Sequence, residues 1–237
     1  MKKYLPLTFL FFIYITVCSC HKKSTIITLK NDSSISTILH QDNSNKPTLL
    51  LIKNDQCGAC KIFYNYVHKN FDSVILPKLP DGTHVYQISI NDFNNQNMWL
   101  FHISNSYAFP TVLYIDKNNN IKGIHKGADL YSFTDFLNTL KNPDKTSNSN
   151  DLKKQSTLLK GYVALIEDHA IPKPLFNEIS KINHQKPEFM GALLEAYFYK
   201  YEKIHPERVT YIKELLQKSL KTSNQFYDIH QKLINDL

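Results

Sequence analysis

The chain has 237 residues, with 28 Lys and Arg against 21 Asp and Glu, 42% hydrophobic residues, six Gly and four Cys. This length holds one large domain or two small ones, and the hydrophobic fraction supports a packed core. The sequence contains neither G-x-G-x-x-G nor G-x-x-x-x-G-K-S/T, so dinucleotide-binding and P-loop chemistry have no support. Four cysteines are too few for a scaffold held together by disulfides.

The N-terminus predicts export followed by attachment to a lipid. Lys2 and Lys3 precede an apolar run over residues 5–17, which is shorter than the ~20 residues of a stable transmembrane helix. A basic start and a short apolar run are typical of a secretory signal. The sequence V-C-S-C at residues 17–20 then resembles a bacterial lipobox. We therefore expect a signal peptide over residues 1–19 and lipidation of Cys20, with Cys18 as a competing site.

An ordinary signal peptide and an uncleaved membrane anchor are the alternatives to the lipoprotein. In the lipidated form, residues 20–24 are a tether whose basic residues suit anionic headgroups, and the protein faces the periplasm of a bacterial cell envelope. Loss of residues 1–19 lowers the net charge from +7 to +5. The excess is almost all Lys, with Arg208 as the one arginine, so we expect a solvated surface and no nucleic-acid partner.

Residues 25–141 alternate between strand and helix patterns. The continuous apolar run before Lys53 is typical of a strand buried on both faces. In chain order we expect a strand at 25–29, the start of a helix at 33–39, a strand at 47–53, a helix after Cys57, a strand at 84–90, a helix at 94–103, a β-hairpin formed by 109–116 and 121–126, and a helix at 132–141.

Residues 142–151 contain no apolar side chain and predict a linker. Beyond it only helical patterns occur, and Pro174, Pro187 and Pro206 stand near first-turn positions. A small helical bundle is favoured over a repeat array, which needs at least three units. The aromatic run over residues 197–201 is expected to pack internally. The expected helices are 152–167, 174–183, 187–201, 206–220 and 224–237, which together make an all-helical C-terminal domain over 152–237.

Two cysteines carry the strongest chemical signal. If Cys18 is removed and Cys20 is acylated, the free thiols are Cys57 and Cys60, in a C-x-x-C motif between a strand and a helix. Unpaired backbone N–H groups and the helix dipole stabilise a thiolate at a helix N-terminus and lower its pKa below ~8.5. The second thiol, one turn further on, can attack a mixed disulfide and release the substrate.

Three other interpretations of this motif stay open. A zinc site usually needs four ligands, but the sequence has no second cysteine pair and no H-x₃₋₅-H spacing. A purely structural disulfide closing so short a loop stabilises little. A redox-silent remnant is the third possibility. We expect no metal and no cofactor.

The sequence resembles the thioredoxin-fold family from about Thr25 to Lys141. Three blocks carry the resemblance, in the order of the family: the apolar strand leading into C-G-A-C-K at 57–61, Y-A-F-P-T-V-L at 107–113, and I-K-G-I-H-K-G-A at 121–128. The resemblance implies an α/β thioredoxin fold, a mixed sheet flanked by helices, for residues 25–141.

The same resemblance implies the roles of the site residues. Cys57 is the nucleophile, Cys60 is the resolving thiol, and the two form a redox-active disulfide. Pro110 is the cis-proline beside them. The backbone of Phe109 is then free to pair with an extended substrate, and Gln56 contributes to the same substrate-binding surface.

The sequence departs from the family at several positions. Gln56 stands where the family often has Trp, and Leu51 replaces a buried acid, although Asp55 lies close to the motif. The Gly-Ala dipeptide lacks the His of strongly oxidising relatives, which favours a reductase or mild isomerase. His102 and His125 are interpreted as ordinary surface or core histidines.

These observations predict a membrane-anchored, periplasmic thiol–disulfide oxidoreductase. Its partners are expected to be protein substrates with disulfides or thiols, an unidentified protein that donates or accepts electrons, and the membrane through the lipid anchor. A variant of this prediction is an enzyme dedicated to one client protein. The alternative is a binding or assembly module at the membrane with little redox turnover, which Gln56 and Leu51 favour.

Overall fold

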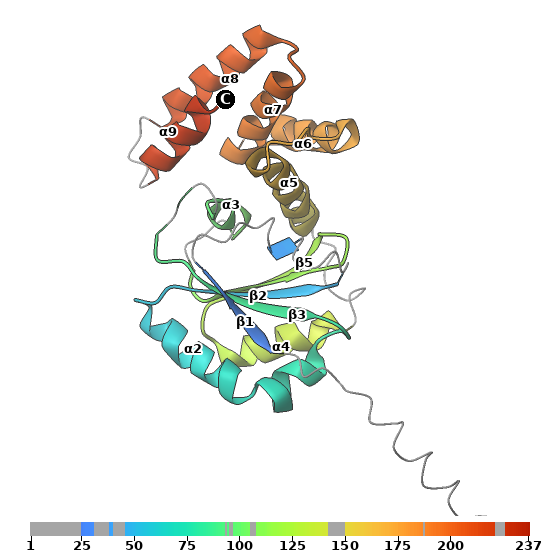
Figure 1. Cartoon of the computed structure of the whole chain (residues 1–237), viewed down its shortest axis with the longest axis vertical. Coiled ribbons are helices and arrows are strands. Elements are labelled where there is room, and N and C mark those ends of the chain that lie inside the picture. The colour runs from blue at the N-terminus through green and yellow to red at the C-terminus, as the bar shows by residue number, and fades with distance from the viewer. Residues whose placement is uncertain are drawn as a thin grey trace, which may run out of the picture.

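A computed structural model describes residues 25–30, 38–39, 46–92, 94, 97–104, 108–141, 150–186, 188–220 and 226–237. A five-stranded sheet with helices on both faces is followed by a helical region, so the predicted fold class is confirmed (Figure 1). The expected signal peptide, Cys20 and the expected linker residues 142–149 lie outside the described residues. The division into domains stays a prediction.

The sheet is mixed, in the order β1-β3-β2-β4-β5. β1 and β2 both pair in parallel with β3, β4 is antiparallel to β2, and β5 is antiparallel to β4. The carboxyl ends of β2 and β3 therefore meet at one edge of the sheet. The strands are β1 (Ile26–Leu29), β2 (Thr48–Lys53), β3 (His84–Ser89), β4 (Thr111–Ile115) and β5 (Ile121–Lys126).

Strand β2 forms the centre of the sheet because its apolar run is buried on both faces. Leu49 and Leu51 belong to one core and Leu50 and Ile52 to the other, and none of the four is more than 1% exposed. Burying each side chain contributes about 1.5–3 kcal/mol. The strand that leads into the C-x-x-C motif is thus firmly fixed.

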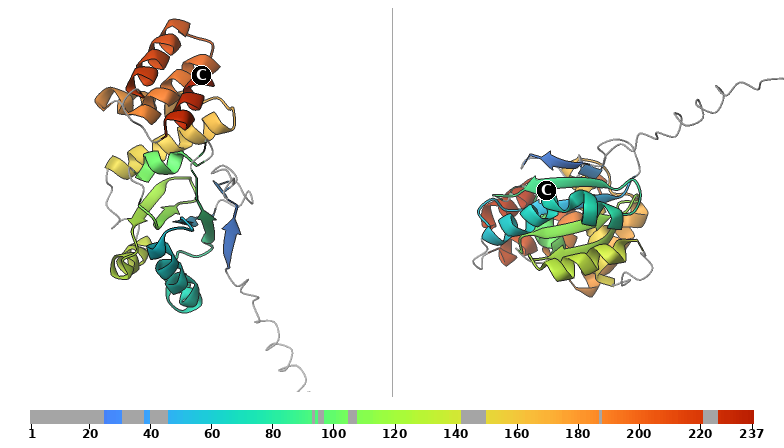
Figure 2. Two further views of the ribbon diagram at one scale, coloured as in Figure 1. Left: turned by 90° about the vertical axis from the view of Figure 1, so that its left-hand side faces the viewer. Right: turned by 90° about the horizontal axis from the view of Figure 1, so that it is seen from below.

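Two helices, α2 (Gly58–Lys69) and α4 (Leu130–Leu140), cover one face of the sheet (Figure 2). A π-helical turn, Phe71–Ile75, and a 3-10 turn, Leu76–Lys78, follow α2. Helix α4 begins two residues before the expected start. The carboxylate of Asp129 accepts hydrogen bonds from the backbone N–H groups of Tyr131 and Ser132, which caps the helix there.

On the opposite face lies α3 (Trp99–Ser104), which is shorter than the helix expected at 94–103. The expected start was wrong for a local reason. The backbone N–H of Asn94 donates to Oδ1 of Asn97 (2.8 Å), the backbone N–H of Asn97 donates to Oδ1 of Asn94 (3.2 Å), and Nδ2 of Asn97 donates to the carbonyl of Asp92 (3.0 Å). Such side-chain bonds to the backbone compete with helix formation.

Helix α5 (Asn150–Ile166) packs on this same face of the sheet, and the C-terminal helices share one hydrophobic core with the sheet. On α5, Oγ of Ser156 accepts a hydrogen bond from the backbone N–H of Ile121 in β5 (2.9 Å), and Nζ of Lys160 donates to Oδ1 of Asn120 (2.6 Å). The C-terminal helices lie close to the predicted ranges: α5 (Asn150–Ile166), α6 (Lys173–Gln185), α7 (Phe189–Tyr201), α8 (Pro206–Ser219) and α9 (Tyr227–Asn235).

Helix α7 is the buried helix of this region, as its aromatic run predicted. Tyr197 and Phe198 are buried, whereas Tyr201 at the end of the run is exposed. The buried carboxylate of Glu195 accepts a hydrogen bond from Nη2 of Arg208 (2.9 Å). The single arginine of the chain therefore neutralises a buried charge within the fold.

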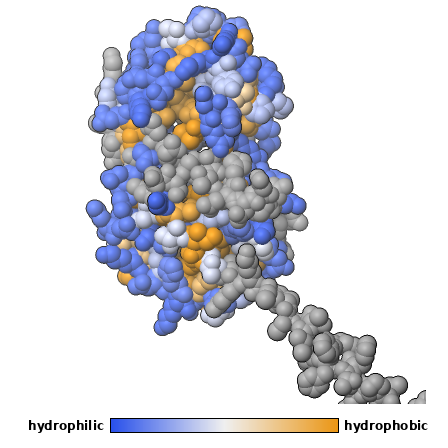
Figure 3. Space-filling model, in the orientation of Figure 1, coloured by the Kyte–Doolittle hydropathy of each residue, from blue (hydrophilic) through white to orange (hydrophobic). Residues whose placement is uncertain are grey.

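The surface shown in Figure 3 is mostly hydrophilic, with apolar residues in separate patches. The exposed large hydrophobic residues are distributed over the sheet part and the helical part alike. Within the described ranges, no helix is both long and apolar enough to cross a bilayer.

Candidate active site

Cys57 lies where β2 passes into α2, and it caps that helix. Its sulfur accepts a hydrogen bond from the backbone N–H of Cys60 (3.1 Å), one turn into the helix. The first turn of α2 contains no acidic residue. Backbone N–H groups and the positive end of the helix dipole therefore face the sulfur, which favours its anionic form in the reduced protein.

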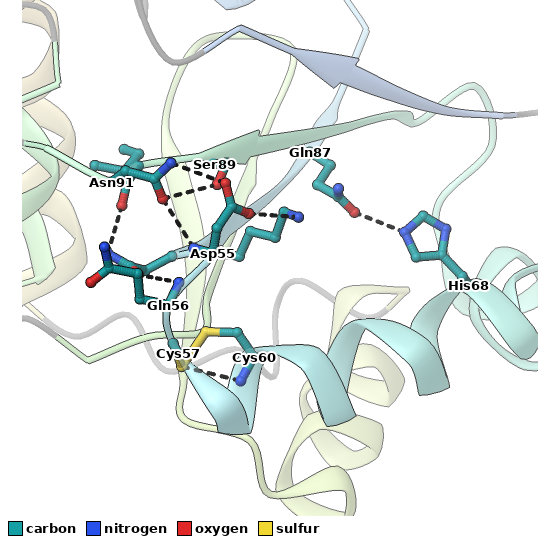
Figure 4. Close-up of polar contacts among 11 residues, drawn as sticks. Asp55, Gln56, Cys57, Cys60, His68, Gln87, Ser89 and Asn91 are labelled. Carbon is teal, nitrogen blue, oxygen red and sulfur yellow. Dashed lines mark hydrogen bonds and ion pairs between the residues drawn. A yellow bond between two sulfur atoms is a disulfide. The ribbon is translucent and has the colours of Figure 1, made fainter.

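Cys57 and Cys60 are joined as a disulfide, with their Cα atoms 5.2 Å apart (Figure 4). Their surroundings differ: Cys57 is half-buried between exposed neighbours, whereas Cys60 is only 1% exposed. A substrate sulfur can therefore approach Cys57 more easily than Cys60. This asymmetry suits an attacking thiol and a resolving thiol, in the order that the sequence predicted.

Phe109 and Pro110, just before β4, lie beside the same cysteine. The Phe109–Pro110 peptide bond is cis, which confirms this detail of the resemblance. The carbonyl oxygen of Phe109 lies 3.7 Å from Sγ of Cys57, and the carbonyl of Pro110 accepts a hydrogen bond from the backbone N–H of Gly127 (2.8 Å). Residues 52 positions apart in the chain thus meet at the cysteine sulfur.

A row of four residues runs across β3, β2, β4 and β5 beneath α2 and α4. Gln87, Leu51, Val112 and His125 are paired side by side on β3, β2, β4 and β5. Leu51 is fully buried, so the position of the family's acid is apolar. Oε1 of Gln87 lies 2.9 Å from Nε2 of His68, on the far half of α2. The row therefore contains no carboxylate.

His125 is a core histidine, in agreement with its interpretation from the sequence. Its ring lies against Phe63 of α2 and Phe133 of α4, with centroids 6.0 and 5.3 Å apart. Burial lowers the pKa of His125, against the opposing effect of its bond to the carbonyl of Gly127 (2.9 Å). The neutral ring thus connects β5 to Gly127, whose backbone N–H donates to the carbonyl of Pro110.

The sequence did not identify one group near the motif. Asn91, just after β3, contacts Asp55 through both its side-chain oxygen and its side-chain nitrogen. Because β2 and β3 are parallel neighbours, residues that follow their carboxyl ends meet at the same edge. Given that pairing, the position of Asn91 directly after the strand could have suggested the contact.

The structure brings four of the predicted site residues together: Cys57, Cys60, Phe109 and Pro110. Gln56 lies beside Cys57 with its side chain exposed. Their roles in a reaction stay predictions, and Cys20 lies outside the described residues. In the part of the chain that the structure describes, no group of three or more His, Cys, Asp or Glu residues could hold a metal ion.

Comparisons with known proteins give distant structural similarities alone. No protein-family model and no curated protein matches the chain. Thioredoxin f2 of Chlamydomonas reinhardtii is 16% identical over 48% of this chain and 95% of its own, with a TM-score of 0.36. The short form of spinach chloroplast thioredoxin f is 16% identical over 52% of this chain and 96% of its own, with a TM-score of 0.37.

At such identities and TM-scores these similarities carry no argument about activity. The thioredoxin-like fold of the chain rests on its own strand order, the helices on both faces, and a C-x-x-C pair opposite a cis-proline. The chain is thus a thioredoxin-fold protein with two cysteines at disulfide distance, followed by a helical region.

Proposed function

We propose that the protein is a thiol–disulfide oxidoreductase that acts on protein substrates. The observation that carries the proposal is the pair of unequal cysteines at the start of α2, with the more accessible one beside a cis-proline loop. A structural disulfide has no need of an accessible sulfur that faces helix N–H groups. The Gly-Ala dipeptide, which has no cation to stabilise the thiolate further, favours a reductase or a mild isomerase over a strong oxidant.

In the reducing direction, the Cys57 thiolate attacks one sulfur of a substrate disulfide. The substrate S–S bond breaks, a mixed disulfide with Cys57 forms, and the other substrate sulfur leaves as a thiolate. Cys60 then loses its proton and attacks Sγ of Cys57, which releases the second substrate thiolate. Two electrons have passed to the substrate, and a dithiol protein must reduce the Cys57–Cys60 disulfide again.

A trapping experiment tests this function. In the full chain with Cys60→Ala, the mixed disulfide between Cys57 and a substrate cannot be resolved. It should accumulate as higher-mass species that disappear on reduction. The double variant Cys57→Ala/Cys60→Ala is the matched control and should form none. If the single variant captures nothing in cells that express it, the alternative of a binding or assembly module is favoured.

We also propose that Cys20 carries the lipid and that the site faces the periplasm. The support is the sequence V-C-S-C after a short apolar run. With Cys20→Ala, the protein should lose incorporated fatty acid. Retention of labelled fatty acid in this variant, with its loss in Cys18→Ala, would assign the lipid to the other cysteine.

A further inference from the structure

The loop that carries Cys57 has no apolar side chain to hold it in place. Residues Asn54, Asp55 and Gln56 connect β2 to the cysteine, and the last two are exposed. Hydrogen bonds within the loop replace packing: the N–H of Gln56 donates to Oδ1 of Asn54 (2.8 Å), and the N–H of Cys57 donates to the carbonyl of Asn54 (3.1 Å). The shape of the loop therefore depends on polar contacts.

Further polar contacts join this loop to the segment after β3, 36 residues away (Figure 4). Nδ2 of Asn54 donates to the carbonyl of Ile90 (3.0 Å). Asn91 makes two bonds to the same residue: its Oδ1 accepts from the N–H of Asp55 (3.0 Å), and its Nδ2 donates to Oδ2 of Asp55 (3.0 Å). Asn91 thus holds both the backbone and the side chain of Asp55.

Asp55 is a strong acceptor in this arrangement. Hydrogen bonds from Ser89, Asn91 and Lys53, in this order of effect, lower the pKa of Asp55 to about 2. Nζ of Lys53 lies 3.0 Å from Oδ1 of Asp55, so the carboxylate is engaged on both of its oxygens. Hydrogen bonds to an ionised acceptor are stronger than neutral ones, and they hold the loop at every ordinary pH.

We propose that Asn91 is a positioning residue for the thiol–disulfide exchange, acting through Asp55 on the loop that holds Cys57. The proposal rests on the function proposed above. Neither Asn91 nor Asp55 forms a covalent bond or transfers a proton in the reaction. Instead, the clamp of Asn91 and Asp55 fixes the cysteine, two residues further on, at the N-terminus of α2. Attack on a disulfide needs the three sulfur atoms in line, so a small shift of the loop lowers the rate.

The geometry suggests a pair of variants with opposite outcomes. Asn91→Asp sets a carboxylate against the carboxylate of Asp55, which breaks one bond and adds repulsion. The double variant Asp55→Asn/Asn91→Asp exchanges the two groups. The new acid at position 91 can accept from the backbone N–H of residue 55 and from its new amide, so the clamp is rebuilt with its polarity reversed. Asn91→Ala removes both bonds without adding a charge, and it should leave the rate unchanged if the contacts of Asn91 do not position the loop.

The test is made in the full chain carrying Cys60→Ala, where Cys57 is the thiol of the motif that reacts. The measurement is the second-order rate constant with the small disulfide 5,5′-dithiobis(2-nitrobenzoate), compared with Cys57→Ala/Cys60→Ala as background. Asn91→Ala and Asn91→Asp should each lower the rate by roughly tenfold. The double variant should regain most of the loss. Asn70→Ala is the control. It removes a hydrogen bond from the side-chain amide of Asn70 to the carbonyl of Tyr66, at the other end of α2, and should leave the rate unchanged.

Asn91 is exposed, so these variants are expected to fold, and urea unfolding of each one checks this. Equal rates in Asn91→Ala and in the parent overturn the proposal, as does a loss that the double variant does not recover. The small disulfide reacts with any accessible thiol, whatever the natural substrate. If the proposed function is wrong, the Cys60→Ala variant captures no protein in cells. If the proposed role of Asn91 is wrong, the rate constants measured here do not change.

Discussion

A pair of buried histidines predicts that the fold weakens in mild acid. His102 of α3 and His230 of α9 face each other, with their Nε2 atoms 3.2 Å apart. The ring of Phe189 in α7 lies against both, with centroids 5.4 Å from His102 and 4.1 Å from His230. The pair thus joins the helix next to the sheet to the C-terminal helical region. Protonation of either ring would place a charge in an apolar contact.

The size of the effect follows from the pKa values. Burial lowers the pKa of His230 from 6.5 to about 4. Burial and then repulsion from His230 lower the pKa of His102 to about 3. Since the folded state takes up protons less readily, the stability from these groups is present above pH 6.5 and is lost as the pH falls towards their folded values. His230 alone accounts for about 3 kcal/mol between pH 7 and 4, from 1.36 kcal/mol per pKa unit.

That loss is a large part of the total stability of a domain, which is ~5–15 kcal/mol. The assay is urea unfolding at pH 7, 6, 5 and 4.5, followed by the fluorescence of Trp99, the single tryptophan, which is buried at the start of α3. His230→Phe keeps an aromatic ring but does not titrate, so stability should fall less steeply with pH. Phe176→Leu, at a ring that stacks on Phe198 in the same helical region (centroids 3.7 Å apart), is the control and should lower stability at each pH without changing the slope.

Other titratable groups also change the free energy of unfolding with pH. Burial also lowers the pKa of His125, which acts over the same range but is present in every variant. Among the described residues, four carboxylates have a lowered pKa, and they destabilise the fold only below about pH 4.5 as they become protonated: Asp55, Asp116, Asp129 and Glu207. A urea midpoint that stays constant from pH 7 to 4.5, or an equal slope in wild type and His230→Phe, would refute the reasoning.

Three further predictions concern buried polar groups. The hydroxyl of Tyr64 is buried and has no hydrogen-bond partner among the residues that the structure describes, so Tyr64→Phe should raise the free energy of unfolding by about 1 kcal/mol. Tyr197→Phe removes a donor to the carbonyl of His169 (3.0 Å) and should lower the free energy of unfolding by a similar amount. If both variants are less stable than the wild type, the reasoning about Tyr64 is contradicted. Arg208→Leu leaves the buried carboxylate of Glu195 without its cation, with the hydrogen bond from Nδ2 of Asn183 (2.7 Å) still in place, and should cost about 3 kcal/mol, measured by urea unfolding. An unchanged midpoint would mean that this ion pair adds no stability.

Local patterns were sufficient to predict the strands of the sheet and the position of the motif. The apolar run of β2 and the helical spacing after Cys57 place the cysteines at a strand-to-helix junction, and the structure shows them there. The helix start at 94 was wrong because bonds between Asn94 and Asn97 outweighed the apolar spacing. The cis bond at Pro110 came from the family resemblance, since no local pattern in the chain specifies it.

Contacts between distant segments could not be predicted. The clamp of Asn91 on Asp55 depends on which strands are neighbours, and the attachment of Ser156 to β5 depends on how the helical region docks. Neither has a periodic signal in the sequence. Polar residues at such contacts resemble any solvated loop or helix face until the register of the sheet is known.

The central claim is that Cys57 performs disulfide exchange, and the most direct test is the reduction of insulin by dithiothreitol. Dithiothreitol supplies the electrons, and the measured quantity is the rate at which insulin disulfides are reduced. We expect the wild-type protein to increase this rate and Cys57→Ser to abolish the increase. If wild type and Cys57→Ser both leave the rate at that of dithiothreitol alone, the protein does not catalyse this exchange and the proposed function is contradicted.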